Sequence, residues 1–330
     1  MMRTLDRRLA ALHAGTARPD DFILADAKDA DMARGLATAG LRQAGTEGRG
    51  AAGFRSRQDY LDDMLQIVRQ GEVDILLASA SNGEALSERG VFAESGVTLA
   101  IRANDTTEIW LGRHAAYARA ASRPFRTARL ERVRPFCDLG LYSVTFNNDL
   151  EHDHATLTAY AAFRDEALRL GFRHFLEVFN PNAPSHLATE EVPAFVNDAI
   201  HRTLAGVTRA ERPVFLKIAY NGARWLEELV SNDPGLVVGI LGGSAGTNRD
   251  AYELLEQAAR HGARVALFGR KIQAAEAPLE LVALMRPVVR GELGAAEAVR
   301  AYHAALERKG LRPARPLAAD LEITEPALRG

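Results

Sequence analysis

One lysine in this sequence stands inside a run that is otherwise apolar. The run is RPVFLKIAY, in which Lys217 lies between Leu216 and Ile218. A charged amine in an apolar strand costs free energy unless it is paired or neutralised. An amine held in this way is the type of nucleophile that forms Schiff bases with carbonyl compounds. Lys217 is therefore a catalytic candidate, and the alternative is a lysine whose stem packs between helices while its amine reaches water.

A carboxylate has a comparable position in the preceding strand-like run, FRHFLEVFNP (172–181). Glu177 has apolar neighbours on both sides, and a buried carboxylate normally needs a cationic partner or a proton. A partnership with Lys217 would explain both residues and would place a general acid and base beside the amine. The alternative is an ion pair that only neutralises charge. Such pairs contribute little to stability, so we favour the functional interpretation for Glu177.

Two glycine-rich turns follow the last two strand-like runs. They are GGSAGT (242–247) and Gly269-Arg270, and helical sequence follows each of them. Turns of this kind present backbone N–H groups that bind anions, and barrels commonly bind phosphate after strands seven and eight. A Schiff-base lysine beside a phosphate site predicts an aldolase that acts on a phosphorylated sugar. The phosphate-binding candidates are Gly243, Ser244, Ala245, Gly246, Gly269 and Arg270.

The order of the elements predicts an α/β fold, a (β/α)8 TIM barrel. Strand-like runs alternate with amphipathic helical sequence along the chain. The earlier runs are FILADAKDA (22–30), VDILLAS (73–79), VTLAIRAN (97–104) and GLYSVTFNND (140–149). We expect one domain over residues 1–330, with its barrel core over about 20–290. A helix over 3–14 would precede this core, and C-terminal helices with a tail over 291–330 would follow it.

The first strand-like run ends in four charged residues, Asp26, Lys28, Asp29 and Asp31. Because side chains alternate along a strand, Asp26 and Lys28 share a face with Leu24. Charges on a core-facing side are rare unless they serve a site. We therefore take Asp26 and Lys28 as catalytic candidates, whereas Asp29 and Asp31 are equally well explained as caps of the following helix.

Polar residues also end other strand-like runs. Arg102, Asn147 and Tyr220 would line the same rim and bind substrate. For Arg102, a contact with phosphate or carboxylate and a salt bridge to a neighbouring acid are equal alternatives. His152 and His154 form an H-x-H pair, but zinc normally takes three protein ligands. We predict neither a metal nor a cofactor.

Three segments are longer or less regular than the connections of a barrel require. GTEGRGAAGFRS (45–56) is either a loop over the barrel mouth or disordered. Residues 105–139 include a basic run, which we interpret as a surface helix in a subunit contact rather than a lid that contributes Arg113 or His114. The Pro-rich tail (311–330) would pack on the outside of the barrel or on a neighbouring subunit.

The composition is that of a globular enzyme. The 330 residues are 47% hydrophobic and 25% charged, with a net charge of -2, which is enough apolar material for one large core. Charges of both signs are interspersed, so no nucleic acid partner is expected. The single cysteine, Cys137, fits a reducing compartment. The sequence has no signal-peptide pattern and no long apolar run, so we expect a cytoplasmic protein with no membrane partner.

With these residues in place, the sequence resembles the archaeal-type class I aldolases, the superfamily of lysine-dependent fructose-bisphosphate and deoxyribose-phosphate aldolases. The pattern covers all the strand-like runs, but its specific part is Lys217, GGSAGT (242–247) and FGRK (268–271), together with Asp26. The resemblance implies that Lys217 forms the Schiff base and that the two turns bind the substrate phosphate. It also implies that Asp26 transfers a proton or binds a hydroxyl, and that the protein is a homo-oligomer.

One position departs from the archaeal fructose-bisphosphate pattern. Those enzymes have a tyrosine acid/base near the end of strand five, where this chain has Phe179. Glu177 can take that role, and a strand-five glutamate resembles the tagatose-bisphosphate and sulfosugar-phosphate branch. We expect a class I lyase that cleaves or forms a ketose phosphate, with dihydroxyacetone phosphate as one half. The alternatives are a condensing or acyl-transfer enzyme that uses Lys28, and a barrel that binds a phosphorylated sugar without turnover.

Overall fold

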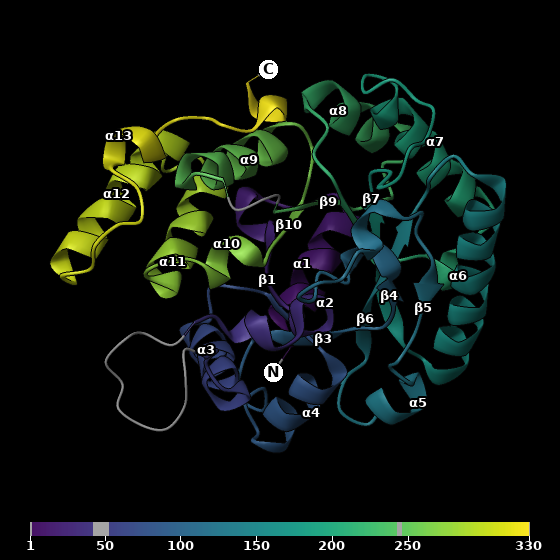
Figure 1. Cartoon of the computed structure of the whole chain (residues 1–330), viewed down its shortest axis with the longest axis horizontal. Coiled ribbons are helices and arrows are strands. Elements are labelled where there is room, and N and C mark those ends of the chain that lie inside the picture. The colour runs from purple at the N-terminus through teal and green to yellow at the C-terminus, as the bar shows by residue number, and fades with distance from the viewer. Residues whose placement is uncertain (1, 42–52, 243–245, 330) are drawn as a thin grey trace.

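A closed barrel of parallel strands forms the centre of the molecule (Figure 1). The structure is a computed structural model that describes residues 2–41, 53–242 and 246–329. Each barrel strand lies beside the next one along the chain, and the first closes on the last. The strands are β1 (Ile23–Lys28), β2 (Ile75–Ala78), β3 (Thr98–Arg102), β6 (Leu139–Thr145), β7 (Arg173–Phe179), β8 (Leu216–Ile218), β9 (Val238–Leu241) and β10 (Val265–Phe268). The predicted (β/α)8 fold is confirmed.

Helices surround the strands, as Figure 1 shows. The sequence marks several of their ends: a Ser56 capping box begins α3 and Thr247 begins α9 in the same way, while Gly71 ends α3 in the left-handed conformation. The helices are α1 (Thr4–His13), α2 (Asp31–Arg34), α3 (Arg57–Gln70), α4 (Ala80–Glu88), α5 (Leu130–Val133), α6 (Leu150–Leu170), α7 (Val192–Ala205), α8 (Ala223–Asn232), α9 (Asn248–Arg260), α10 (Arg270–Gln273), α11 (Pro278–Val289), α12 (Ala295–Arg308) and α13 (Leu317–Asp320). None of these described helices is both long and apolar enough to cross a membrane.

Each barrel strand buries both of its faces. One apolar cluster lies inside the barrel and includes Ala25 of β1, while a second lies under the helices and includes Leu24. Leu5 and Leu9 of α1 belong to the inner cluster, so α1 closes the amino end of the barrel. Parallel strands buried on two faces read as continuous apolar runs. The alternation of such a strand therefore separates two sets of residues without telling which set faces the lumen.

The segment between β3 and β6 forms no long basic helix, which corrects that expectation. It contains a two-stranded antiparallel sheet of β4 (Asp105–Thr106) and β5 (Pro124–Phe125). Trp110 packs edge-on against Phe125, with 4.9 Å between ring centroids. Proline disfavours a helix interior because it lacks an N–H, and the aromatic contact stabilises the folded-back path. Of the expected loop over 45–56, only residues 53–56 lie within the described part of the chain.

Candidate active site

Lys217 and Glu177 meet inside the barrel. They are direct neighbours in the register between β7 and β8, and Lys217 Nζ lies 2.5 Å from Glu177 Oε1. The flanking residues Leu216 and Ile218 belong to the outer cluster, so alternation along β8 turns Lys217 into the lumen. The two side chains are only 8% and 2% exposed. The structure thus brings together the amine and the carboxylate that the sequence singled out.

Arg102 and Ser143 hold the other oxygen of Glu177. Ser143 Oγ donates to Glu177 Oε2 at 2.6 Å, and Arg102 Nη2 donates to the same oxygen at 3.2 Å. Arg102 Nη1 also donates to Ser143 Oγ at 2.8 Å. The two contacts orient the carboxylate so that Oε1 is directed at Lys217. Two carboxylates raise the pKa of Arg102 despite its burial, so its guanidinium stays charged.

The second carboxylate beside Arg102 is Asp29, at the end of strand β1. Arg102 Nε donates to Asp29 Oδ2 at 2.5 Å. Burial by itself would raise the pKa of Asp29, but Arg102 and Lys217 together hold it below the ordinary value. Asp29 makes no capping contact with α2, because no side chain caps that helix. The residue belongs to the cavity instead, as an ionised carboxylate that balances the buried guanidinium.

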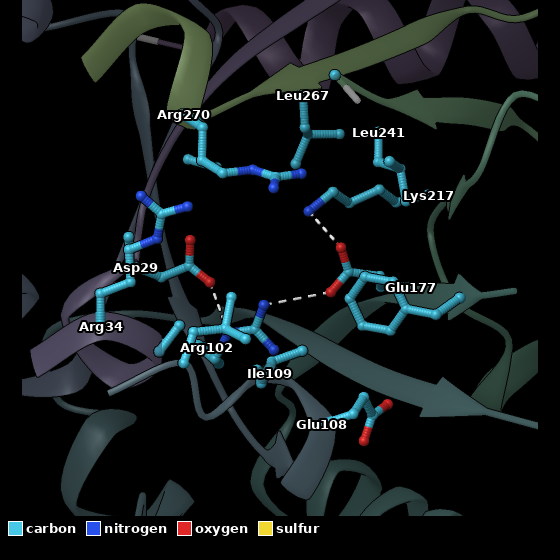
Figure 2. A pocket seen from close by; sticks show the side chains of 17 residues that line it. Asp29, Arg34, Arg102, Glu108, Ile109, Glu177, Lys217, Leu241, Leu267 and Arg270 are labelled. Atoms are coloured by element: carbon cyan, nitrogen blue, oxygen red, sulfur yellow. Dashed lines mark hydrogen bonds and ion pairs between the residues drawn. The ribbon is translucent and has the colours of Figure 1, made fainter. Parts of the chain in front are cut away.

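A cavity of about 230 Å³ opens at the carboxyl ends of the strands. In Figure 2, the amine of Lys217 and the guanidinium of Arg270 point toward the same space, and Arg34 lies at its side. Burial and the nearby charge of Arg34 lower the pKa of Arg270. Both arginines line the cavity together with Ala27, Asp29, Ala30, Ala33, Arg102, Glu108, Ile109, Leu111, Glu177, Phe179, Lys217, Leu241, Gly242, Leu267 and Gly269. Cationic side chains outnumber acidic ones in this lining, which favours an anionic ligand.

Two glycines in the wall are required by close packing. A Cβ on Gly269 would lie 2.6 Å from the backbone oxygen of Ala27, and one on Gly242 would lie 2.4 Å from the ring of Phe268. Both glycines line the cavity, as predicted for the turn at Gly269. Three predicted phosphate-binding residues, Gly243, Ser244 and Ala245, lie outside the described residues. Gly246 does not line the cavity, and its carbonyl accepts a hydrogen bond from Lys271 Nζ at 2.7 Å.

The structure does not bring Asp26 and Lys28 to the cavity. They share a face with Leu24, as alternation required, but that face lies under the helices. Lys28 Nζ is 3.4 Å from Asp26 Oδ2 and donates to Gln273 Oε1 at 2.7 Å. Burial raises the pKa of Asp26 to about 6, although Lys28 opposes the rise. Their predicted placement beside the cavity is therefore corrected, and Asp29, the residue after β1, is the acid that lies in the cavity near Lys217.

Two other predicted rim residues serve contacts elsewhere. Asn147 accepts from the backbone N–H of Ser122 at 2.9 Å and donates to Asn182 Oδ1 at 3.0 Å. The hydroxyl of Tyr220 donates to Gln257 Oε1 at 2.9 Å, in the layer between strands and helices. Neither residue lines the cavity, whereas Arg102, predicted with them, does.

Sequence reasoning missed Arg34, Ser143 and Glu108. Ser143 could have been found, because it lies two residues beyond Leu141 on the lumen face of β6. Glu108 Oε1 accepts a hydrogen bond from Thr145, and no spacing in the sequence indicates that contact. Arg34 lies in a four-residue helix whose position depends on tertiary packing. Arg34 and Glu108 extend the polar part of the site beyond the strand ends, whereas Ser143 lies within β6.

Comparisons with known proteins identify the fold. No protein-family model and no curated protein matches the sequence. An archaeal fructose 1,6-bisphosphate aldolase is 14% identical with a TM-score of 0.61, covering 87% of this chain and 99% of the other. A structure of an archaeal fructose-1,6-bisphosphate aldolase whose catalytic lysine carries the carbinolamine intermediate is 16% identical, with a TM-score of 0.62 and coverages of 87% and 100%. A Corynebacterium glutamicum protein is 16% identical, with a TM-score of 0.60 and coverages of 87% and 94%.

This likeness lies in the fold. The chain has the barrel of the archaeal aldolases over most of its length, so the resemblance read from the sequence is confirmed at that level. Fold alone does not fix chemistry, because one barrel architecture carries many reactions. The chemistry of this chain therefore depends on the side chains in its cavity.

Proposed function

We propose that this protein is a class I aldolase that forms a Schiff base between Lys217 and the carbonyl of a ketose phosphate. The enzyme then cleaves, or in reverse forms, the adjacent carbon–carbon bond. The observation that carries the proposal is the 2.5 Å contact between Lys217 Nζ and Glu177 Oε1 inside a cavity lined by further cations. The shared fold with an archaeal enzyme whose catalytic lysine binds the substrate covalently supports it.

In the first step, Glu177 moves a proton between the amine and the substrate. Lys217 gives a proton to the Glu177 carboxylate, and its free electron pair attacks the carbonyl carbon to form a carbinolamine. The protonated Glu177 then returns the proton to the carbinolamine hydroxyl, which leaves as water and produces the iminium. Ser143 and Arg102 keep the carboxyl group in one orientation. This lowers the entropic cost of reaching the geometry in which proton transfer occurs.

In the second step, the iminium accepts the electron pair of the C3–C4 bond. The hydroxyl on C4 gives its proton to the Glu177 carboxylate, the bond breaks, and an aldehyde leaves while the other half remains as an enamine on Lys217. Protonation of the enamine carbon and addition of water release the ketone and restore the amine. Asp29 remains ionised beside Arg102 and lies where it can accept a hydrogen bond from a substrate hydroxyl.

The cationic side of the cavity binds the phosphate in this proposal. Arg270 and Gly269 line it from the end of β10, and Arg34 lies beside Arg270. A guanidinium matches two phosphate oxygens at once, which orients the substrate as well as holding it. Dihydroxyacetone phosphate is the half that fits this arrangement, with its carbonyl at Lys217 and its phosphate at Arg270.

Lys28 and Asp26 have no part in this chemistry. Both side chains are almost fully buried under the helices, and a nucleophile has to reach its substrate. The alternative based on a Lys28 nucleophile therefore requires a rearranged outer layer. A barrel that binds a sugar phosphate without turnover is the remaining alternative. The test below distinguishes all three.

The test is reductive trapping followed by peptide mass spectrometry. The protein is incubated with saturating dihydroxyacetone phosphate, reduced with borohydride and digested. We expect a reduced adduct on Lys217 in the wild-type protein and in Lys28→Met, and no adduct in Lys217→Arg. An adduct on Lys28 would establish the second alternative. Thermal stabilisation by the ligand without any adduct would establish the binding protein and overturn the proposal.

A further inference from the structure

The C-terminal segment (residues 311–329) packs against the start of α9. Figure 1 shows α13 and the C-terminus, in yellow, beside α9. Thr247 Oγ1 donates to the backbone oxygen of Glu322 at 2.7 Å. Asp250 Oδ1 accepts from the backbone N–H of Thr324 at 2.7 Å. Of the two placements expected for this tail, the structure has the one on the outside of its own barrel, with specific contacts at the start of α9.

Asp320 is the acidic centre of this contact. Its side chain is almost fully buried, Oδ1 accepts from the backbone N–H of Asn248 at 2.8 Å, and Oδ2 accepts from Asn248 Nδ2 at 2.6 Å. His303 Nε2 lies 2.9 Å from Oδ2. The first N–H groups of a helix lack partners within the helix and attract anions. The Asn248 N–H at the start of α9 is therefore used by an internal carboxylate and not by the substrate.

Gly246 and Lys271 connect the C-terminal segment to the cationic wall of the cavity. Gly246 O accepts from Lys271 Nζ at 2.7 Å and from Arg315 Nη1 at 3.3 Å. Lys271 follows Arg270, which lines the cavity, and Gly242 lines it at the other end of the loop. None of the cavity-lining residues belongs to the C-terminal segment. The segment therefore acts on the wall only through the backbone that it holds.

We propose that Asp320 is a positioning residue for the phosphate of the substrate, and that the C-terminal segment supports the anion-binding wall from outside the cavity. This inference rests on the proposed function, because it assigns the phosphate to the side of the cavity formed by Gly242 and Arg270. Asp320 fixes Asn248 at the start of α9. Gly246, two residues before Asn248, accepts the hydrogen bond from Lys271 Nζ, and Lys271 directly follows Arg270. The position of Asn248 therefore affects the position of the turn at Arg270.

The inference predicts a selective defect. Lys217 and Glu177 lie on β8 and β7 and are held by the barrel register, so loss of Asp320 leaves the reacting amine in place. The phosphate contacts depend on the backbone that Asp320 holds, and small displacements of binding groups are costly. A ligand with a phosphate should therefore lose affinity, whereas the same ligand without a phosphate should not. A general loss of structure would weaken both ligands.

The experiment compares Asp320→Ala with Glu322→Ala. Glu322 is two residues away in the same segment, and its exposed side chain carries the same charge, so it is a matched control. Dissociation constants are measured by calorimetry for dihydroxyacetone phosphate and for dihydroxyacetone. We expect Asp320→Ala to weaken binding of the phosphate ester about 10- to 100-fold. Binding of dihydroxyacetone should change by no more than about twofold, and Glu322→Ala should bind both ligands as the wild type does.

A second variant keeps the test decisive if Asp320→Ala folds poorly. Asp320→Asn retains an acceptor for the Asn248 N–H, and we expect its affinity for the phosphate ester to lie between those of the wild type and Asp320→Ala. Equal losses for the two ligands, or unchanged affinity for the phosphate ester in a folded variant, would overturn the inference. Calorimetry reports binding whether or not an imine forms, and borohydride trapping reports the imine separately, so a wild-type protein that binds the ester but forms no imine would refute the aldolase proposal alone.

Discussion

Glu177 Oε1 lies 2.5 Å from Lys217 Nζ, and the two residues are paired directly in the register between β7 and β8. The pair is held by the sheet itself, so its geometry does not depend on a loop. Ser143 satisfies the second carboxylate oxygen at 2.6 Å. A buried ion pair of this kind contributes little stability. Its consequence is that a proton has a short path between the amine and the carboxylate.

Replacing Glu177 by Gln should separate proton transfer from binding. The amide keeps the size of the side chain and an oxygen for Ser143, but it cannot take up the proton from Lys217. We expect kcat to fall about 10²- to 10⁴-fold, while borohydride still traps an adduct on Lys217 at a lower rate. The measurements are steady-state cleavage and the time course of trapping. An undiminished kcat would assign the proton transfer to another group.

Replacing Arg102 by Met should destabilise the protein strongly. The variant leaves Asp29 and Glu177 without the buried cation that contacts both of them. Loss of one partner from a buried ionic network costs about 3–5 kcal/mol, measured as the free energy of unfolding in urea. Arg89→Met is the control, because the Arg89 side chain is 38% exposed and its Nη1 lies 3.8 Å from Asp62 Oδ1. Its effect should stay below about 1 kcal/mol. Equal effects of the two changes would show that the Arg102 network is not structural.

The pair Asp26 and Lys28 should control part of the pH dependence of stability. Burial raises the pKa of Asp26 from 3.8 to about 6. The folded protein therefore binds the Asp26 proton more tightly than the unfolded chain does, so this contribution is complete below pH 4. It is lost as the pH rises through 6, and it amounts to about 3 kcal/mol.

The double variant Asp26→Leu with Lys28→Met tests this assignment. Removing both charges should leave the free energy of unfolding at pH 7 unchanged or higher. The difference in stability between wild type and variant should shift by about 3 kcal/mol between pH 4 and 7, as measured by urea unfolding at each pH. Trapping on Lys217 should persist because neither residue lines the cavity. A flat difference across this range would show that Asp26 does not titrate there.

Gly269→Ala should displace the turn that forms part of the cationic wall, and Gly112→Ala should leave that turn in place. A Cβ at position 269 would lie 2.6 Å from the backbone oxygen of Ala27, whereas one at position 112 meets nothing within 4 Å. A backbone oxygen cannot rotate away, so the turn has to move. We expect a loss of about 1–3 kcal/mol in stability and weaker binding of dihydroxyacetone phosphate. Thermal unfolding with and without the ligand measures both, and a Gly269→Ala protein equal to Gly112→Ala would contradict the packing argument.

The strands and the central pair were predictable from the sequence for the same reason. Apolar β-like runs followed by amphipathic helices indicate a parallel barrel, and a charge inside such a run needs a partner. Lys217 and Glu177 stand out by residue type alone. Strand β1 was less informative, because it carries two charged residues on one buried face and a third directly after it. Alternation grouped Asp26 with Lys28 but gave no sign that Asp29 belongs to the lumen.

The remaining features depend on contacts between distant residues. Asp320 and Asn248 are 72 positions apart, and no local periodicity reports such a contact. Arg34 lies beside Arg270 only because the ends of β1 and β10 are neighbours in the barrel. Its type gives no clue, since most arginines are on the surface. Patterns along the chain therefore identify the central pair of Lys217 and Glu177, while the cationic wall of the cavity is visible only in the fold.

The helix at the amino end of the barrel has a kinetic consequence. Leu5 and Leu9 of α1 fill that end with apolar side chains, so substrate and products pass through the mouth at the carboxyl ends of the strands. In the proposed aldolase reaction, one half stays covalently attached to Lys217 while the other diffuses out by that route. Release is thus sequential, with the aldehyde first and the ketone phosphate last. Product inhibition should be competitive for the ketone phosphate and noncompetitive for the aldehyde.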